Sequence, residues 1–111
     1  MDEPIQPLTV RAADVPSGWM LRVAGELDAA TAPDLLATFD GLPVQGDEVV
    51  VDIAEVSFID SSGLRALLQM RQAAESTDRA LVVRRPARQA WRLLQLSGLT
   101  GLLAPDENAP A

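Results

Sequence analysis

The chain has 111 residues and a net charge of −7, and it contains no cysteine, histidine, tyrosine or lysine. This composition excludes a disulfide framework, an imidazole base, a Schiff-base amine, and a zinc site built from histidine or cysteine. The negative charge also disfavours binding to nucleic acid or to an anionic membrane surface.

The length predicts one domain, and no apolar run approaches the 18 or more residues that a membrane span needs. The first residues are acidic and lack the pattern of a signal peptide, so we expect a soluble, cytoplasmic protein. Residues 1–7 contain two prolines and predict a flexible N-terminus.

The first elements of the chain predict a β-hairpin. Residues 8–12 alternate between apolar and polar side chains, as a half-buried strand does, and residues 16–18 (Pro-Ser-Gly) are a turn signal. Residues 19–24 alternate again, which predicts a second strand. The short turn between the two runs favours antiparallel pairing.

A helix and a buried strand follow. Residues 31–42 show helical spacing, with Thr31 at the N-cap and Pro33 in the first turn, where its missing N–H has no cost. Gly41 ends this helix. Residues 49–53 form a nearly continuous β-branched run, which predicts an interior strand covered on both faces.

The strongest helical pattern covers residues 61–75. Leu64, Leu67 and Leu68 fall at positions i, i+3 and i+4, and Ala74 continues the same face. Residues 81–83 (Leu-Val-Val) then predict another interior strand.

The C-terminal part predicts a helix over residues 86–96, closed by Gly98, and a last short strand over residues 99–103. Residues 104–111 are predicted to be a disordered tail. Strands alternating with helices imply parallel pairing. We therefore expect an α/β domain over residues 8–103, with a mixed, mostly parallel sheet of four to five strands and packed helices.

Polar residues that could carry chemistry gather where the chain leaves a buried strand and enters the helix of residues 61–75. Asp60 and Ser62 are both candidates to cap that helix, and Ser62 is the better candidate as a cap than as a modification site. Gly63 is unusual in a first helical turn, where it costs about 1 kcal/mol relative to alanine. It indicates that another surface approaches the backbone closely.

Catalytic interpretations of this segment fail by inspection. A nucleophilic serine would need a histidine or lysine base, and the chain has neither. Oxygen chemistry alone would allow a metal ion held by Asp28, Asp52 and Asp60, but solvated carboxylates are common and nothing fixes their geometry. The sequence therefore predicts no enzyme activity, no metal site and no cofactor.

Three motifs in this order resemble the STAS domain family, over roughly residues 8–103. They are Gly-Glu-Leu-Asp at residues 25–28, Asp-Ser-Ser-Gly-Leu at residues 60–64 and Leu-Leu-Gln-Leu-Ser-Gly-Leu at residues 93–99. Within that family the chain is most similar to the bacterial anti-sigma factor antagonists.

This resemblance implies a binding module that is switched by phosphorylation of Ser61. The kinase would be an anti-sigma factor with a histidine-kinase-like ATPase fold. The unmodified protein would bind this anti-sigma factor and free the sigma factor, and a phosphatase would reset the phosphorylated form. The implied contact residues are Asp28, Asp60, Ser61, Ser62, Gly63 and Arg65.

The sequence leaves several alternatives open. Asp28 and Arg65 could be solvated surface residues, Asp60 could orient Ser61 or only cap the helix, and Trp91 could belong to the core or to a contact surface. Self-association is also open. The chain could instead be a structural STAS subunit of a lipid-transport complex or a stress-signalling scaffold, or, less in keeping with its composition, a small enzyme or nucleotide-binding domain.

Overall fold

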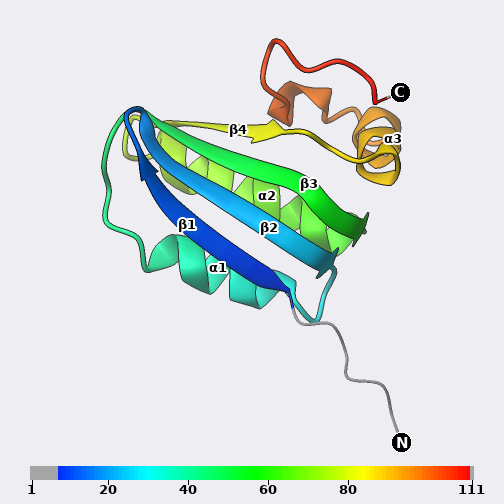
Figure 1. The fold of residues 1–111 in the computed structure, drawn as a ribbon, viewed down its shortest axis with the longest axis horizontal. Helices are drawn as coiled ribbons and strands as arrows, with labels where there is room; N and C mark the ends of the chain where they lie inside the picture. Colours follow the sequence, from blue (N-terminus) through cyan, green and yellow to red (C-terminus); the bar gives the residue numbers. More distant parts are fainter. Residues whose placement is uncertain (1–7, 111) are drawn as a thin grey trace, which may run out of the picture.

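The computed structural model describes residues 8–110 and contains one mixed β-sheet with the strand order β1-β2-β3-β4 (Figure 1). The first two strands pair antiparallel, and the other two pairings are parallel. The elements are β1 (Thr9–Val15), β2 (Gly18–Leu27), α1 (Ala32–Asp40), β3 (Glu48–Ile59), α2 (Ser61–Glu75), β4 (Ala80–Arg84), α3 (Arg88–Leu96) and the 3₁₀ helix η1 (Thr100–Leu102).

The predicted hairpin is confirmed, and both of its strands are longer than predicted. β1 and β2 pair from Thr9↔Ala24 to Val15↔Gly18. Leu21 and Val23 are buried and Arg22 is exposed, in agreement with the predicted alternation. One face of the hairpin therefore contributes to the core.

β3 lies in the interior of the sheet, between β2 and β4. Every residue from 49 to 53 is buried, which confirms a strand that is covered on both faces. Parallel strands need crossover connections, and α1 and α2 supply them for the two parallel pairs.

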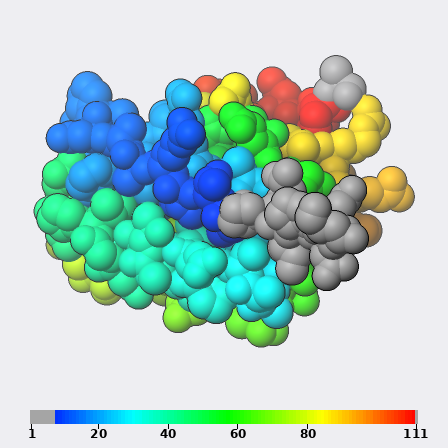
Figure 2. All heavy atoms as spheres, turned by 60° about the horizontal axis from the view of Figure 1, so that its bottom comes forward, coloured from blue at the N-terminus to red at the C-terminus, as the bar shows by residue number. Residues whose placement is uncertain are grey.

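The main core fills the space between one face of the sheet and the helices α1 and α2. Figure 1 shows both helices on this face, and in Figure 2 α1 forms a teal band of the surface below the blue residues of β1. The largest fully buried side chains include Leu21, Leu27, Leu35, Val49, Val51, Ile53, Ile59, Leu67 and Met70.

Two predictions near the C-terminus were wrong. β4 is not interior, because it lies at the edge of the sheet and its only strand partner among the described residues is β3. The predicted strand over residues 99–103 is the 3₁₀ helix η1, followed by a single parallel bridge between Val83 and Leu103. An apolar run of five residues is compatible with either structure, and only packing separates them.

Helix boundaries differ from the predictions by two residues at most. α1 ends at Asp40, with Gly41 as its C-cap, and α3 begins at Arg88 because Ala87 is extended. Among residues 8–110, no helix is both long and apolar enough to cross a membrane.

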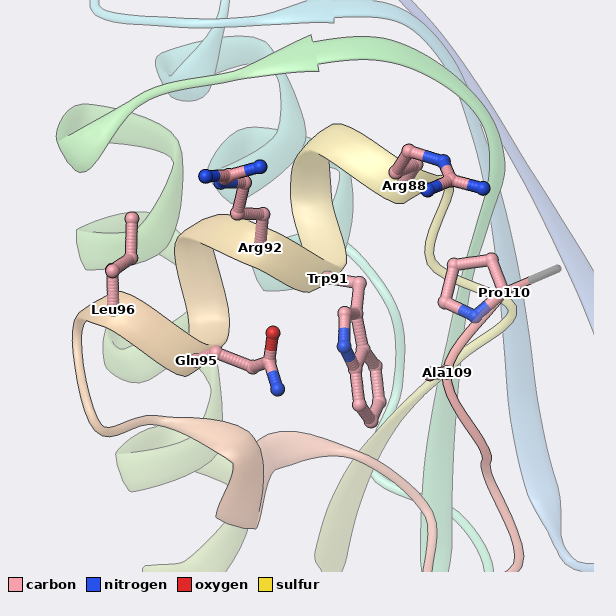
Figure 3. A pocket seen from close by; sticks show the side chains of 7 residues that line it. All are labelled: Arg88, Trp91, Arg92, Gln95, Leu96, Ala109 and Pro110. Carbon is pink, nitrogen blue, oxygen red and sulfur yellow. The ribbon is translucent and has the colours of Figure 1, made fainter.

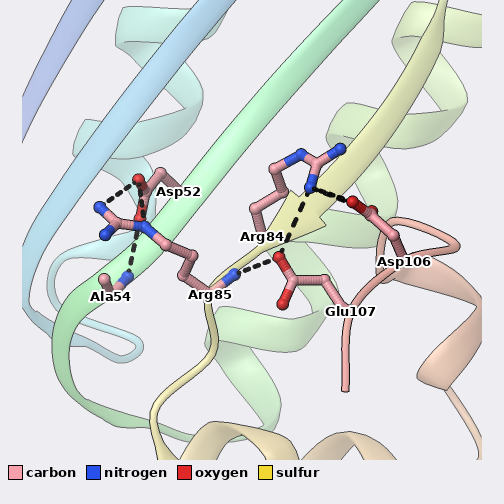
Figure 4. A network of polar contacts seen from close by, with 6 residues as sticks. All are labelled: Asp52, Ala54, Arg84, Arg85, Asp106 and Glu107. Carbon is pink, nitrogen blue, oxygen red and sulfur yellow. Dashed lines mark hydrogen bonds and ion pairs between the residues drawn. The ribbon is translucent and has the colours of Figure 1, made fainter. Parts of the chain in front are cut away.

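The segment after Leu103 lies against β4. Arg84 Nη1 is 3.1 Å from Asp106 Oδ1 and 3.7 Å from Glu107 Oε1, and the Arg85 N–H donates a hydrogen bond to Glu107 Oε1 (Figure 4). A disordered tail, as predicted for residues 104–111, would not make these contacts of Asp106 and Glu107. The domain boundary at residue 103 stays a prediction, and the predicted flexible N-terminus, residues 1–7, lies outside the described residues.

Candidate functional site at the start of helix α2

Two loops lie side by side at the C-terminal ends of β2 and β3, because these two strands are paired in parallel. Leu27 at the end of β2 pairs with Ile59 at the end of β3, and the Asp60 N–H donates a hydrogen bond to the Leu27 carbonyl. Asp28 and Asp60 directly follow the paired residues. The parallel register therefore brings the predicted residues of the two loops to one place.

Asp60 is the N-cap of α2. Its backbone is extended, and its Oδ1 accepts hydrogen bonds from the N–H groups of Ser62 (2.9 Å) and Gly63 (3.1 Å). The expectation that Ser62 caps the helix was wrong. Ser62 is the second helical residue, so its N–H needs an acceptor and its hydroxyl is past the capping position.

Ser61 is the first residue of α2 and its side chain is exposed. Because Asp60 already satisfies the first N–H groups, the Ser61 hydroxyl is not needed for capping. No other described residue forms a hydrogen bond with this hydroxyl. The Ser61 oxygen is thus presented to solvent at the positive end of a 15-residue helix.

Gly63 is buried, and its close neighbours belong to this domain. A Cβ built on Gly63 would lie 2.6 Å from the Leu27 carbonyl oxygen and 2.7 Å from Ile59 Cγ1. The close approach predicted at this glycine is therefore the docking of α2 on the ends of β2 and β3. Gly63 is therefore explained by packing within the domain, and its role as a contact residue stays a prediction.

Asp28 organises the loop before α1. Its Oδ1 accepts hydrogen bonds from the N–H groups of Ala30 (3.0 Å) and Thr31 (3.1 Å), and the Thr31 hydroxyl donates to the Glu26 carbonyl (2.7 Å). Thr31 occupies the N-cap position of α1, but its side chain makes no capping bond. Asp28 is partly buried. Its hydrogen bonds give it a structural role in this loop, in addition to any contact with a partner.

A shallow hollow of about 240 Å³ extends from these loops along the seam between α1 and α2. Arg65 is exposed and lies one helical turn after Ser61, and within residues 8–110 it forms no ion pair. The floor is mostly small and apolar. The hollow is lined by Ala29, Ala32, Pro33, Leu36, Ser62, Arg65, Ala66 and Gln69.

Gln89 of α3 also supports the site, and the sequence analysis missed it. Its amide nitrogen donates to the Ile59 carbonyl (2.8 Å), and its amide oxygen accepts from the Ile59 N–H (2.9 Å). The side chain therefore satisfies both backbone groups of the residue that precedes Asp60. No local pattern could reveal this contact, because the two residues are 30 positions apart.

Asp52 lies apart from the site. Its Oδ2 accepts hydrogen bonds from Arg85 Nη2 (2.7 Å) and Nε (3.0 Å), and its Oδ1 accepts one from the Ala54 N–H (Figure 4). The hydrogen bond to Asp52 raises the pKa of Arg85 above its ordinary value. Among residues 8–110, no group of three or more acidic residues is placed to hold a metal ion, so Asp28, Asp52 and Asp60 do not form a cluster.

Comparison with known proteins identifies the family. A family model described as "Mlab, STAS domain" matches residues 10–104. The chain belongs to the STAS domain family. An anti-sigma-B factor antagonist from Staphylococcus epidermidis is 31% identical to this STAS domain over 88 residues, which cover 78% of this chain and 82% of the relative.

Solved structures show the same fold. An anti-sigma factor antagonist from Mycobacterium paratuberculosis has a TM-score of 0.73 at 23% identity, covering 93% of this chain and 87% of the other. Unphosphorylated SpoIIAA, also an anti-sigma factor antagonist, has a TM-score of 0.72 at 22% identity, covering 86% of each chain. By sequence and fold, this STAS domain belongs with the anti-sigma factor antagonists.

The same fold is found in a phosphorylated protein and in a domain of a transporter. SpoIIAA in its phosphorylated form has a TM-score of 0.65 at 20% identity, over 86% of this chain and 89% of the other. The STAS domain of a SulP transporter from Vibrio cholerae has a TM-score of 0.61 at 16% identity, over 81% of this chain and 70% of the other. The fold alone therefore leaves the function to be argued from the site.

Proposed function

We propose that this STAS domain is an anti-sigma factor antagonist controlled by phosphorylation of Ser61. The proposal rests on the arrangement at the start of α2. Asp60 caps the helix, and the exposed Ser61 hydroxyl forms no hydrogen bond with another described residue. A kinase can reach that oxygen without first breaking the structure. The kinase would transfer the γ-phosphoryl group of ATP to Ser61 Oγ, and ADP and the hydroxyl proton would leave.

The local charges favour a switch that acts at the interface. A phosphate adds about −1.5 to −2 charges, and the start of a helix stabilises an exposed anion by about 0.3–1 kcal/mol. The fold therefore tolerates the modification. A partner that fits closely around Ser61, beside Asp28 and Asp60, would have to bury the added charge. A loss of about 4 kcal/mol in binding free energy weakens a complex roughly a thousandfold.

The proposed contact surface consists of the Asp28 loop, Ser61, Ser62 and Arg65 around the hollow between α1 and α2. Its partner is an anti-sigma serine kinase with a histidine-kinase-like ATPase fold, and a phosphatase removes the phosphate. The partner supplies the chemistry, so the STAS domain needs no cofactor or metal and acts as a binding protein. Its proposed location is the cytoplasm. The existence of SpoIIAA in both phosphorylation states supports this proposal.

A second candidate is a structural STAS subunit that binds its partner constitutively, for example in a lipid-transport or stress-signalling complex. The structural similarity to a transporter STAS domain favours keeping it. In that case the surface around Ser61 would hold a permanent partner, and a negative charge at Ser61 would have little effect on binding.

A paired pull-down from host lysate separates the two functions. The baits are Ser61→Ala, Ser61→Asp and a control, Ser76→Asp, which adds the same charge at the exposed opposite end of α2. We expect Ser61→Ala and Ser76→Asp to retain an ATP-binding kinase that Ser61→Asp loses. Purified kinase and ATP should then phosphorylate the wild type, and mass spectrometry should locate the phosphate on Ser61. Equal retention of transport or scaffold proteins by all baits would overturn the switch.

A further inference from the structure

The two outer strands of the sheet differ in how their free edges are covered. At β4, the Ala104 N–H donates a hydrogen bond to the Val83 carbonyl, and Leu103 forms a bridge with Val83. Within residues 8–110, β1 (Thr9–Val15) pairs with β2 alone, and no backbone group outside this hairpin bonds to it. Figure 1 shows β1 at the outer edge of the sheet. Alternate N–H and carbonyl groups of β1 therefore point away from the sheet, without a backbone partner among the described residues.

The free edge of β1 lacks most of the features that prevent pairing with another chain. Proteins usually protect such an edge with a very short strand, a proline, a bulge or a covering segment. β1 is seven residues long, contains no proline and pairs with β2 without a bulge. An extended segment of another protein can continue a sheet at an edge of this kind, because its backbone supplies the missing hydrogen bonds.

Two arginines face each other beside this edge. Arg11 of β1 is the register partner of Arg22 of β2, and both side chains are exposed. They lie on the face opposite the main core, because the neighbouring Leu21 and Val23 are buried. Figure 1 shows no helix in front of β1 and β2 on this face. Like charges at directly opposite positions destabilise a sheet, so an anion beside this pair would be favourable.

No acidic side chain of residues 8–110 forms an ion pair with Arg11 or Arg22. Asp52 of β3 is the register partner of Arg22, but its Oδ2 accepts hydrogen bonds from Arg85 and its Oδ1 accepts one from a backbone N–H. Glu55 lies in the same hollow of about 200 Å³ as the two arginines. The surface around the arginine pair therefore carries a positive charge, in a chain whose net charge is −7. The hollow is lined by Thr9, Arg11, Arg22, Val23, Ala24 and Glu55.

We propose that β1 binds an acidic segment of another protein, which adds to the sheet as a further strand. The backbone of the segment pairs with the free edge of β1, and carboxylates on its alternate residues lie beside Arg11 and Arg22. A side chain directly opposite Arg11 on the added strand would have its Cβ about 5 Å from the Arg11 Cβ. The backbone pairing supplies affinity, and the charge-assisted hydrogen bonds of the arginines select the acidic partner.

The charge pattern of β1 favours this occupant over a second copy of the chain. The residues on the same face as Arg11 are Thr9, Ala13 and Val15, whereas Asp14 lies on the opposite face. Two copies paired through β1 about a two-fold axis would bring both Arg11 side chains to one face and offer no β1 carboxylate to either. Nucleic acid and anionic membranes are disfavoured, because the net charge repels an extended anionic surface. A short acidic segment contacts only the positive surface around Arg11.

This binding does not rest on the proposed switch at Ser61. Ser61 follows the C-terminal end of β3, whereas Arg11 and Arg22 lie within the hairpin of β1 and β2. The hollow at the arginine pair shares no residue with the hollow between α1 and α2. Binding to β1 should therefore be equal in wild type and in Ser61→Asp, so a failure of one proposal is distinguishable from a failure of the other.

The test uses the full chain and a fluorescein-labelled peptide of seven residues in which glutamate alternates with valine. Two further peptides have the same sequence but methylated backbone nitrogens, at the glutamates in one and at the valines in the other. A strand bonds to one neighbour through alternate residues only, so only one of these methylated sets faces β1. A lysine–valine peptide of the same pattern is the control for charge. Fluorescence anisotropy in low salt measures binding.

The variant is Arg11→Glu, and its matched control is Arg92→Glu, which makes the same charge change at an exposed site on α3. Arg11→Glu replaces the like-charge pair with an opposite-charge pair to Arg22, so the variant should remain folded. Circular dichroism checks the folding of both variants. Sedimentation of the wild type alone detects pairing of two copies.

We expect saturable binding of the glutamate–valine peptide, weakened roughly tenfold or more by Arg11→Glu and less than about twofold by Arg92→Glu. One methylated peptide should bind as the parent peptide does, and the other should not bind. The lysine–valine peptide should not bind either. The proposal is overturned by no saturable binding, by equal losses in the two variants, or by equal binding of the two methylated peptides. Tighter binding to phosphatidylglycerol vesicles or oligo-dT, or a wild-type dimer that excludes the peptide, would also overturn it.

Discussion

The start of α2 and the C-terminal segment are attached to the same sheet by different means. The start of α2 is fixed by side-chain bonds to backbone groups and by close packing at Gly63. The C-terminal segment is held against β4 by hydrogen bonds from the Ala104 N–H to the Val83 carbonyl and from the Arg85 N–H to Glu107, and by ion pairs of Arg84 with Glu107 and with the exposed Asp106. Packing and capping bonds are insensitive to salt, whereas exposed ion pairs contribute little and are screened.

This difference suits the two regions to different tasks. The proposed modification of Ser61 would require a fixed geometry for a tightly fitting partner, and Asp60 and Gly63 fix the backbone around Ser61. A hollow lies between α3 and the C-terminal segment (Figure 3), and Ala109 and Pro110 form one of its walls. These two residues come shortly after the exposed ion pair of Asp106 in the chain.

Substitution of Gly63 by alanine should give the largest effect. The added Cβ would lie 2.6 Å from the Leu27 carbonyl oxygen, so α2 would have to move away from β2. We expect a net loss of about 1–3 kcal/mol in the free energy of unfolding, despite the better helix propensity of alanine. Urea denaturation measures it. Gly101→Ala is the control, because its Cβ would meet nothing within 4 Å; equal stability of the two variants would contradict this account.

Removal of the α2 cap should have the next largest effect. Asp60→Ala leaves the N–H groups of Ser62 and Gly63 without their acceptor, which costs about 1 kcal/mol. Asp60→Asn keeps a capping oxygen and should lose much less. Chemical denaturation of both variants tests the cap, and an alanine variant as stable as the asparagine variant would show that Asp60 has no capping role.

Much of the fold could be predicted because its signals are local. The β-branched run of β3 and the leucine spacing of α2 each report burial directly. The edge position of β4 and the 3₁₀ helix η1 could not be predicted in this way, since the number of strands beside β4 and the conformation of residues 100–102 depend on tertiary packing. Apolar runs alone do not say how many neighbours a strand has.

The candidate site shows the same division. Residues 60–62 stand out in the sequence because polar capping residues at a helix start form a local pattern, whereas Asp28 was implied by the resemblance to the STAS family. The burial of Gly63 under Leu27 and the contact of Gln89 with Ile59 are tertiary, so the sequence could indicate a close approach at Gly63 but not its partner.

Gln89 of α3 holds the residue that precedes Asp60, and its removal should loosen the site locally. Gln89→Leu keeps the size of the side chain but leaves the Ile59 N–H and carbonyl without their partners, at a cost of about 1 kcal/mol. We expect faster hydrogen exchange at the Ile59 amide than in wild type, with little change in the centre of β3. Gln95→Leu on the same helix is the control. An Ile59 amide that remains protected would contradict a positioning role for Gln89.

The ion pairs of the C-terminal segment should give the smallest effect, and it should depend on pH. The hydrogen bond from Arg84 holds the pKa of Asp106 below its usual range. A lowered folded-state pKa means that the contact stabilises the segment above the unfolded pKa, about 3.9, and that this contribution is lost as pH falls through the lower folded value. Ala109 and Pro110, which line the hollow beside Trp91, come a few residues after Asp106 in the chain. We therefore expect Trp91 emission to shift over the same pH range in a Trp19→Phe background, before far-UV circular dichroism changes. Asp106→Asn should show the shifted emission already at pH 7 and in low salt. An Asp106→Asn spectrum identical to that of the parent at pH 7 would mean that the wall does not depend on this ion pair.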